Sequence, residues 1–214
     1  TDEEIKKLEE LLDDPNTKPM IIAGHGVEIA KAQKELLEFA EKHNIPVCNT
    51  LLGLSTFPQD HKLFAGMIGM HGDAVTNYAV HDANLVISVG SRFDDRIFGN
   101  LEAFCKDTKF VHVDIDVSEF HKMVKTDLPL AGDAKDILER ANTLIGKEHK
   151  YPEWWKQIEE WKKEYGFLDF KVNPVNDDTF LSQPRIVKMI SDATNGEAIV
   201  SADVGRHQMW TGRF

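Results

Sequence analysis

The segment GSRFDDR, residues 90–96, sets two arginines against two aspartates directly after an apolar run. Arg92 and Arg96 are four residues apart, so on a loop or a first helical turn their guanidinium groups can point to one side. Guanidinium groups suit phosphate oxygens, and Asp94 and Asp95 could hold them in place. A surface network of ion pairs would contribute little stability, typically less than ~1 kcal/mol per pair. The spacing alone leaves a ligand clamp and a structural network equally open, with acid–base or metal chemistry of the carboxylates as a third interpretation.

The segment GHGVEI, residues 24–29, stands where an apolar run gives way to helical periodicity. Glycine at such a turn lets the backbone approach a phosphate near a helix N-terminus. The dinucleotide fingerprint is incomplete, because Ile29 occupies the place of its third glycine. The next strand also ends in Cys48, Asn49 and Thr50 instead of an acid for a ribose. We therefore predict a tight turn that lines a ligand groove, in preference to a standard NAD site.

The segment GMIGMHG, residues 66–72, has three glycines and a histidine just before a predicted helix. His71 could act as a general base, since imidazole titrates near neutrality. No orienting carboxylate can be identified for it in the sequence. A glycine-rich bend that passes close to a flat or extended ligand is the favoured interpretation.

Carboxylates cluster at the end of a predicted strand in DIDVSE, residues 114–119. Such a group can bind a hard cation, but the glycine and the later glutamate of an EF-hand are missing. An acid at this place can instead accept hydrogen bonds from ribose hydroxyls, a role that suits Asp114 or Glu119. A simple helix cap by Asp116 or Ser118 would look the same in sequence.

The pair Gly132-Asp133 opens another predicted helix. A magnesium-diphosphate motif would need paired asparagines downstream, and they do not follow. Asp133 is therefore predicted to be a helix N-cap, with the glycine edge beside it open to a ligand.

The elements that must position these residues are short apolar strands that alternate with helices. The predicted strands are 19–24, 45–50, 83–90, 109–116 and 128–132, and the predicted helices are 2–13, 27–43, 73–83 and 133–145. The first helix has capping-box spacing at Thr1 and Glu4 and ends before Pro15. Crossover helices cover both faces of a parallel sheet. The pattern predicts an α/β, doubly wound, Rossmann-like parallel sheet of about six strands, followed by a helical linker.

The pattern changes after Gly146. An amphipathic helix carries an aromatic face made of Trp154, Trp155, Ile158, Trp161 and Tyr165. The charge around it is mixed or acidic, so packing against a neighbouring domain is favoured over stacking on nucleic acid. Breaker-rich residues 172–178 follow, then a helix at 181–194 capped by Ser182, and a strand at 197–205. One helix and one strand cannot bury a sheet, so we expect the chain to be part of a longer polypeptide.

Composition excludes several classes of protein. The 214 residues carry 25 basic and 36 acidic side chains, a net charge of −11, which disfavours binding to nucleic acid. No apolar run is long enough for a membrane span, and the charged start TDEEIKKLEE is unlike a secretory signal. The two cysteines, Cys48 and Cys105, suggest neither a zinc site nor a disulfide scaffold. A cytoplasmic protein with small-molecule ligands is expected.

Several motifs, in this order and spacing, resemble one family. They are PMIIAGHGV, NTLLGLSTFP, GMIGMHGDAVTNYAVHDANLVISVGSRFDDRIFG, VHVDIDVSE and ADVGRHQMW. Together they resemble the central domain and following linker of the large, catalytic subunit of acetohydroxyacid synthase, also called acetolactate synthase. The resemblance implies a thiamine-diphosphate enzyme that decarboxylates pyruvate and joins the hydroxyethyl group to a second 2-keto acid. It further implies that the middle of three domains binds FAD, which takes no net redox part in the reaction.

The resemblance assigns cofactor contacts motif by motif. It implies FAD contacts at Gly24, Gly26, Thr50, Leu51, Leu52, Met70, His71, Gly72, Gly90, Arg92, Asp94, Arg96, Asp114, Ile115, Glu119, Gly132 and Asp133. It places Val204, Gly205, His207, Gln208 and Met209 in the pocket for thiamine diphosphate. Arg206 stands where the family usually has glutamine and receives no role.

The resemblance also implies a division of the chain. Residues 1–148 would be the central FAD-binding domain, 149–182 a linker with the aromatic helix, and 183–214 the start of the thiamine-diphosphate domain. The family's activating glutamate and its magnesium-diphosphate motif belong to other domains. We therefore expect no catalytic residue and no metal ligand in this chain, and no synthase activity from it alone. The implied partners are further copies of the subunit, as a dimer or tetramer, and in some cases a regulatory small subunit.

Two other interpretations remain open. One is a flavin-free relative in the same superfamily, either a catabolic acetolactate synthase or a keto-acid decarboxylase. The motifs RFDDR and GMHG favour the flavin-binding type over this relative. The other is a free-standing nucleotide-binding module without synthase chemistry. Such a module has no use for the trailing ADVGRHQMW, which favours the enzyme.

Overall fold

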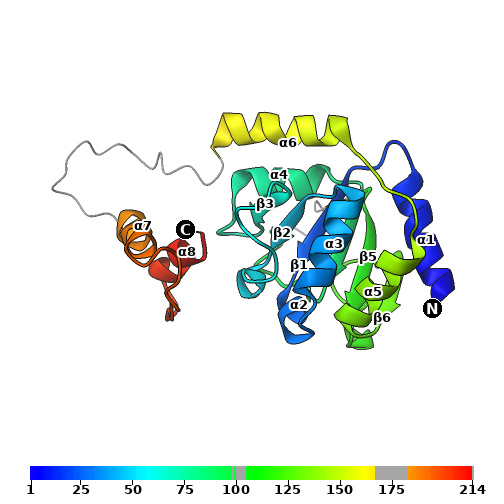
Figure 1. Ribbon diagram of the computed structural model, residues 1–214, viewed down its shortest axis with the longest axis horizontal. Helices are drawn as coiled ribbons and strands as arrows, with labels where there is room; N and C mark the ends of the chain where they lie inside the picture. The colour runs from blue at the N-terminus through cyan, green and yellow to red at the C-terminus, as the bar shows by residue number, and fades with distance from the viewer. Residues whose placement is uncertain (98, 100–104, 167–182, 214) are drawn as a thin grey trace. The chain divides into compact units, whose positions relative to one another are not determined.

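The computed structural model describes residues 1–97, 99, 105–166 and 183–213 (Figure 1). They form two compact units, Thr1–Tyr165 and Gly166–Phe214, which are described separately. The elements of the first unit are α1 (Asp2–Asp13), β1 (Pro19–Ala23), α2 (His25–Ile29), α3 (Gln33–His43), β2 (Val47–Asn49), the 3-10 helix η1 (Leu51–Gly53), β3 (Phe64–Met67), α4 (Ala74–Asp82), β4 (Leu85–Val89), β5 (Lys109–Asp114), the 3-10 helix η2 (Val117–Glu119), β6 (Leu128–Ala131), α5 (Ala134–Leu144) and α6 (Pro152–Tyr165).

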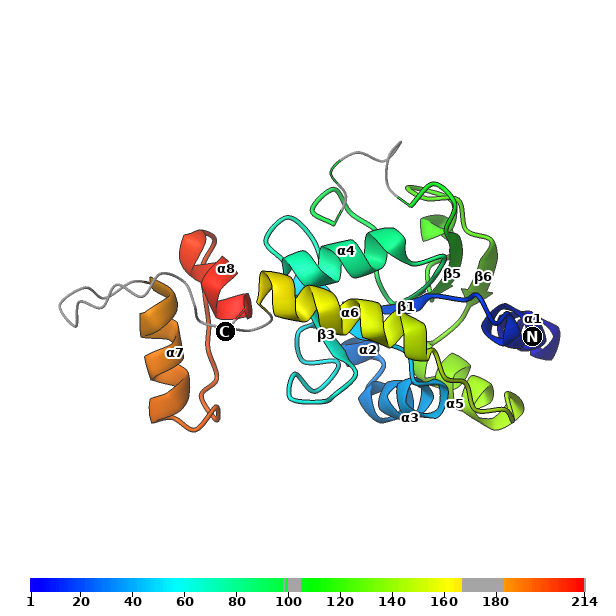
Figure 2. The same cartoon turned by 90° about the horizontal axis from the view of Figure 1, so that it is seen from above.

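The strands form one parallel sheet in the order β3-β2-β1-β4-β5-β6. The chain moves outward from β1 in one direction to β2 and β3, then returns to β4 and continues in the other direction. Helices α3 and α5 pack together on one face of the sheet, and α4 lies on the other (Figure 2). All residues of β1 and β4 are buried, as a sheet covered on both faces requires. The predicted doubly wound α/β fold is confirmed.

Most predicted elements form, and the differences have local causes. Thr1 and Glu4 make the predicted capping box of α1. The single helix predicted at 27–43 is two helices, because Lys31 adopts a left-handed conformation with φ 54° between them. Strand β3 was not predicted, since Gly66 within it, at φ 103°, interrupts the apolar pattern and suggested a bend.

Helix α6 covers the amino ends of two strands. The indole N–H of Trp154 donates to the carbonyl of Pro19 at 3.0 Å, and that of Trp155 donates to Asn44 at 2.8 Å. Trp154 is buried. The aromatic face therefore packs against the sheet domain, as the charge pattern favoured, and the helix belongs to the first compact unit, although the sequence suggested that it lies in a linker.

The second unit contains α7 (Gln183–Ala193) and α8 (Arg206–Arg213), which contact each other. Residues 197–205 do not form the predicted strand. Ile199 in this segment is fully exposed, and the described residues of the second unit include no other strand with which it could pair. The predictions for residues 172–178 and for the Ser182 cap lie outside the described residues. Within the described ranges, no helix has the length and apolar character needed to cross a membrane.

A buried pair of histidines joins three segments at the edge of the first unit. Nδ1 of His43 lies 2.9 Å from Nδ1 of His149, and Nε2 of His149 lies 3.0 Å from the carboxylate of Asp13. With Nε2–H of His149 donating to Asp13, Nδ1 of His149 accepts a hydrogen bond from Nδ1–H of neutral His43. Burial, with smaller contributions from nearby His149 and Lys42, lowers the pKa of His43 to about 3. Protonation of His43 is therefore disfavoured in the folded state at neutral pH.

We expect acid to destabilise the chain through His43. The folded pKa lies below the usual value of 6.5, so the unfolded state takes up the proton first and stability falls as the pH falls from about 6.5 toward 3. At pH 5 the expected loss in the free energy of unfolding is about 2 kcal/mol. Urea denaturation at pH 7 and pH 5 measures it. His43→Asn, which keeps the donor to His149, should shrink the difference, whereas His81→Asn at an exposed site should not; equal pH dependence in all three chains would contradict the assignment.

Candidate functional site

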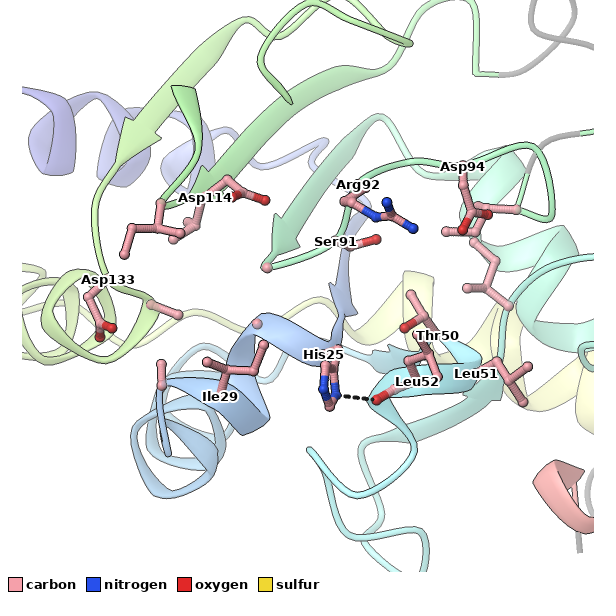
Figure 3. A pocket seen from close by; sticks show the side chains of 18 of the residues that line it. His25, Ile29, Thr50, Leu51, Leu52, Ser91, Arg92, Asp94, Asp114 and Asp133 are labelled. Carbon is pink, nitrogen blue, oxygen red and sulfur yellow. Dashed lines mark hydrogen bonds between the residues drawn. The ribbon is translucent and has the colours of Figure 1, made fainter. Parts of the chain in front are cut away.

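A cleft of about 630 Å³ lies at the carboxyl ends of the strands (Figure 3). Its walls come from the carboxyl ends of all six strands and the segments after them. The strand order reverses between β1 and β4, and this switch point is where doubly wound sheets bind ligands. The volume is typical of small-molecule sites.

The turns after β1 and β4 touch through their backbones at the base of the cleft. Gly24 N–H donates to Val89 O at 2.9 Å, and Gly26 N–H donates to Gly90 O at 3.0 Å. A Cβ atom on Gly24 would lie 2.2 Å from Gly90 O, and one on Gly26 would lie 2.6 Å from Gly90 Cα. The tight turn predicted from GHGVEI therefore forms, and Gly26 and Gly90 line the cleft while Gly24 lies behind them.

The loop Gly90–Arg96, which we call the clamp loop, presents its charged side chains to the cleft. Arg92, Asp94 and Arg96 all line it, and all are exposed. Arg96 lies 4.0 Å from Asp95, with both side chains largely exposed, so this ion pair contributes little. The carboxylate of Asp94 accepts from the backbone N–H of Arg96 at 3.0 Å and so shapes the loop itself. Within the described part of the chain, no carboxylate forms an ion pair with Arg92.

Phe93 points the opposite way from its neighbours in the clamp loop. Its side chain is buried, and its φ of 53° is unusual for a residue other than glycine. The ring meets Phe110 and His112 edge-on, with centroids 5.6 and 5.0 Å away. This packing anchors the loop and leaves Arg92 facing outward.

Acidic residues at the ends of β5 and β6 have separate roles. Asp114 lines the cleft, and one of its oxygens accepts from the N–H of Asp116 at 2.9 Å. Asp116 caps η2, which confirms the helix cap considered in the sequence analysis. The hydrogen bond from Ser118 lowers the pKa of Asp116. Glu119 pairs with Lys122 at 2.7 Å and is not among the cleft residues.

Asp133 is the N-cap of α5, as predicted. Its carboxylate accepts from the N–H groups of Lys135 and Asp136 at 2.8 and 3.4 Å. Gly132 and Asp133 both line the cleft.

An apolar wall faces the charged residues. Thr50, Leu51 and Leu52 line the cleft after β2, and Ile115 lines it after β5 with 75% of its surface exposed. Apolar side chains that stay exposed beside a polar cleft suit a ligand with a planar, partly apolar ring. Other residues that line the cleft were not assigned a role from the sequence: His25, Ile29, Ala30, Ile68, Ser91, Ile97, Val113 and Ala134.

His25 carries the clearest overlooked signal, because it stands between the two glycines of the first turn. Its Nδ1 lies 2.9 Å from the carbonyl of Leu52 (Figure 3), so the turn after β1 is tied to η1.

Of the glycine-rich bend, Ile68 lines the cleft, whereas Met70, His71 and Gly72 lie beside it. Met70 N–H donates to Arg96 O at 2.9 Å, which joins the bend to the end of the clamp loop. Met70 and His71 are exposed, and Gly72 is half-buried. The residues predicted to approach thiamine diphosphate, Val204, Gly205, His207, Gln208 and Met209, belong to the second unit, in and just before α8.

Chemically, the cleft can hold an anionic ligand that carries hydroxyl groups. Two guanidinium groups can meet phosphate oxygens, and the glycine turns allow close backbone approach. The carboxylate of Asp114 can accept hydrogen bonds from sugar hydroxyls. The three features converge on one cleft from different strand ends.

Comparison with known proteins identifies a family and several relatives. Residues 5–141 match the family model described as thiamine pyrophosphate enzyme, central domain. The chain is 40% identical to the probable acetolactate synthase large subunit of Methanocaldococcus jannaschii over 214 residues, which cover 99% of the chain and 36% of that protein. It is 39% identical to the acetolactate synthase large subunit of Lactococcus lactis over 98% of the chain and 36% of that protein. With acetolactate synthase isozyme 3 large subunit of Escherichia coli the identity is 34%, over 92% of the chain and 34% of that protein. The chain spans about a third of the length of these relatives.

The contact between the glycine turns predicts a large cost for adding one carbon atom. Gly26→Ala would force the two turns apart, and we expect the free energy of unfolding to fall by about 2 kcal/mol, the scale of overpacking in a core. Urea denaturation of the 214-residue chain measures this loss. Gly146→Ala is the matched control, because nothing lies within 4 Å of the added atom and the expected change is within about 0.5 kcal/mol. Equal stability of the two variants would show that the turns are not in close contact.

Proposed function

The chain belongs to the thiamine pyrophosphate enzyme family, whose central domain it matches, and we propose that it is the FAD-binding middle part of an acetolactate synthase large subunit. The names of its relatives support this proposal; such an enzyme would condense pyruvate with a second 2-keto acid. Thiamine diphosphate and magnesium would serve that reaction in the whole protein. The FAD would have a structural role and no net redox role.

The observation that carries the proposal is the convergence of opposite chemistries on one cleft. Arg92 and Arg96 lie on one wall, and the carboxylate of Asp114 lies on another, both above the glycine turns. A dinucleotide needs this combination, because its diphosphate is anionic and its ribose hydroxyls donate hydrogen bonds. Arg92 would hold the diphosphate and Asp114 would receive the ribose. Leu51 and Leu52 would pack on a ring of the cofactor.

Residues beside the cleft would extend the site for a ligand as long as FAD. Met70, His71 and Gly72 continue the surface from Arg96, through the hydrogen bond between Met70 and Arg96. Gly24 and Glu119 would support the site from behind the residues that line it. This extension would suit FAD better than a mononucleotide, which would need only the cleft.

The rest of the chain would serve the whole enzyme. We propose that residues 1–148 form the FAD domain, that 149–182 lead from it, and that 183–214 belong to the thiamine-diphosphate domain. Val204, Gly205, His207, Gln208 and Met209 would then approach that cofactor. Homo-oligomers, as dimers or tetramers, and a regulatory small subunit would be the protein partners, and small molecules the ligands.

Titration of the 214-residue chain with FAD tests the proposal, followed by flavin fluorescence, with NAD and ADP in parallel. Arg92→Ala and Arg96→Ala should each raise the dissociation constant for FAD about tenfold or more, because each removes a charge-assisted hydrogen bond. Arg140→Ala is the matched control, since Arg140 pairs with Asp2 on exposed helix surfaces and is not a cleft residue. A thermal shift with NAD and none with FAD would overturn the choice of ligand. Unchanged FAD binding in both clamp-loop variants would show that the two arginines belong to a structural network and not to a ligand clamp.

A further inference from the structure

His112 is a buried polar residue directly under the cleft. It lies in β5, two residues before Asp114, and its side chain has no exposed surface. Its neighbours in the strand, Val111 and Val113, are buried and apolar. Placing an imidazole in such surroundings costs free energy unless it is hydrogen-bonded. The contacts of its ring therefore indicate what it does.

One ring nitrogen of His112 reaches the clamp loop. Nε2 lies 2.9 Å from the carbonyl oxygen of Ser91, so this nitrogen carries the proton and donates it. Ser88 Oγ donates to the same carbonyl at 3.4 Å. Nε2 also lies 3.6 Å from the carboxylate of Asp114, within electrostatic range. The imidazole thus connects the loop that carries Arg92 with the acid at the end of β5.

The other ring nitrogen explains why the imidazole is neutral. Nδ1 is buried and has no hydrogen-bond partner among the residues that the structure describes. A second proton there would be buried without an acceptor. Burial lowers the pKa of His112, although Asp114 and the hydrogen bond to Ser91 oppose the shift. The ring is consequently fixed in one tautomer, with its only N–H directed at Ser91.

The same ring forms one side of the slot that holds Phe93. Phe110 and His112 are two residues apart on β5 and so face the same side of the sheet. Phe93 fits between them at 5.6 and 5.0 Å, in its left-handed conformation. Such a backbone conformation persists only when its surroundings hold it. His112 therefore contacts the clamp loop twice, through the Ser91 carbonyl and through the Phe93 ring.

We propose that His112 is a positioning residue, whose hydrogen bond to Ser91 and contact with Phe93 hold the clamp loop so that Arg92 and Asp114 face one ligand. The part of the proposal that concerns a ligand rests on the proposed function. The part that says His112 keeps the clamp loop ordered does not. No role for His112 was predicted from the sequence, because it is a single polar residue between apolar neighbours in a strand. Its effect on a cofactor is indirect, since the residue is buried and is not among those that line the cleft.

Trypsin measures the order of the clamp loop without any ligand, because it cleaves after Arg92 and Arg96. His112→Phe keeps an aromatic ring in the slot and removes the donor to Ser91. We expect cleavage at these two sites to become about tenfold faster, as followed by mass spectrometry. His112→Gln supplies an amide N–H in place of Nε2–H and should restore most of the protection.

A matched control separates loop order from global stability. Val111→Ala lies in the same strand on its opposite face and removes buried apolar volume without touching the clamp loop. It should lower the midpoint of urea denaturation yet leave cleavage after Arg92 and Arg96 close to that of the wild-type chain. If His112→Phe and Val111→Ala, compared at equal stability, are cleaved equally at these sites, the positioning role is wrong.

FAD titration of the same variants gives the second measurement. We expect His112→Phe to raise the dissociation constant about tenfold and His112→Gln to recover most of the affinity. A wild-type chain that fails to bind FAD, with a loop that still opens in His112→Phe, would refute the proposed ligand and support the positioning role. Unchanged affinity in His112→Phe, in a chain that binds FAD, would overturn the link between loop order and binding.

Discussion

Two glycine turns, one after β1 and one after β4, meet at the only reversal of strand order in the described sheet. Their backbones are so close that a single Cβ on Gly26 would collide with Gly90. The contact removes side chains from the base of the cleft and leaves backbone there, so every specific side chain must come from the rim. His25, Arg92 and Asp114 occupy that rim because each lies within three residues of a strand end.

Contacts at the other end of the sheet, where the strands have their amino ends, stabilise the first unit. Trp154 and Trp155 close the amino ends of the strands through hydrogen bonds to backbone carbonyls, and the pair His43 and His149 joins helices α1 and α3 to the segment before α6. The two indole N–H groups and both ring nitrogens of His149 have partners within the protein. Residues at the carboxyl edge, such as Arg92, remain exposed and lack such partners within the described chain. Stabilising contacts thus lie at the amino ends of the strands and candidate ligand-binding groups at the carboxyl ends. This separation allows polar groups to gather at the carboxyl ends without weakening the core.

Local features were predictable from sequence, and features made by tertiary contact were not. The Asp133 cap and the Thr1 capping box depend on neighbours within three residues, so spacing reveals them. Ile68 joins the cleft wall only because β3 pairs with β2, and β3 itself was hidden by Gly66. The family resemblance predicted a ligand role for Arg92 and Arg96, which line the cleft, but it could not show that Phe93 anchors the loop between them. That inward turn follows from the slot formed by Phe110 and His112, which no local pattern encodes.

The protein has a net charge of −11, so the attraction of an anionic ligand must come from the clamp loop itself. At physiological ionic strength the Debye length is about 8 Å, so distant carboxylates are largely screened and the nearest charges decide. Asp114 and Asp94 are themselves cleft residues, and they oppose an anion unless the guanidinium groups lie closer to it. A freely moving loop would average the position of Arg92 and lose this advantage. Fixing Ser91 and Phe93 from below therefore matters, because screened charges elsewhere on the protein cannot make up for a misplaced guanidinium group.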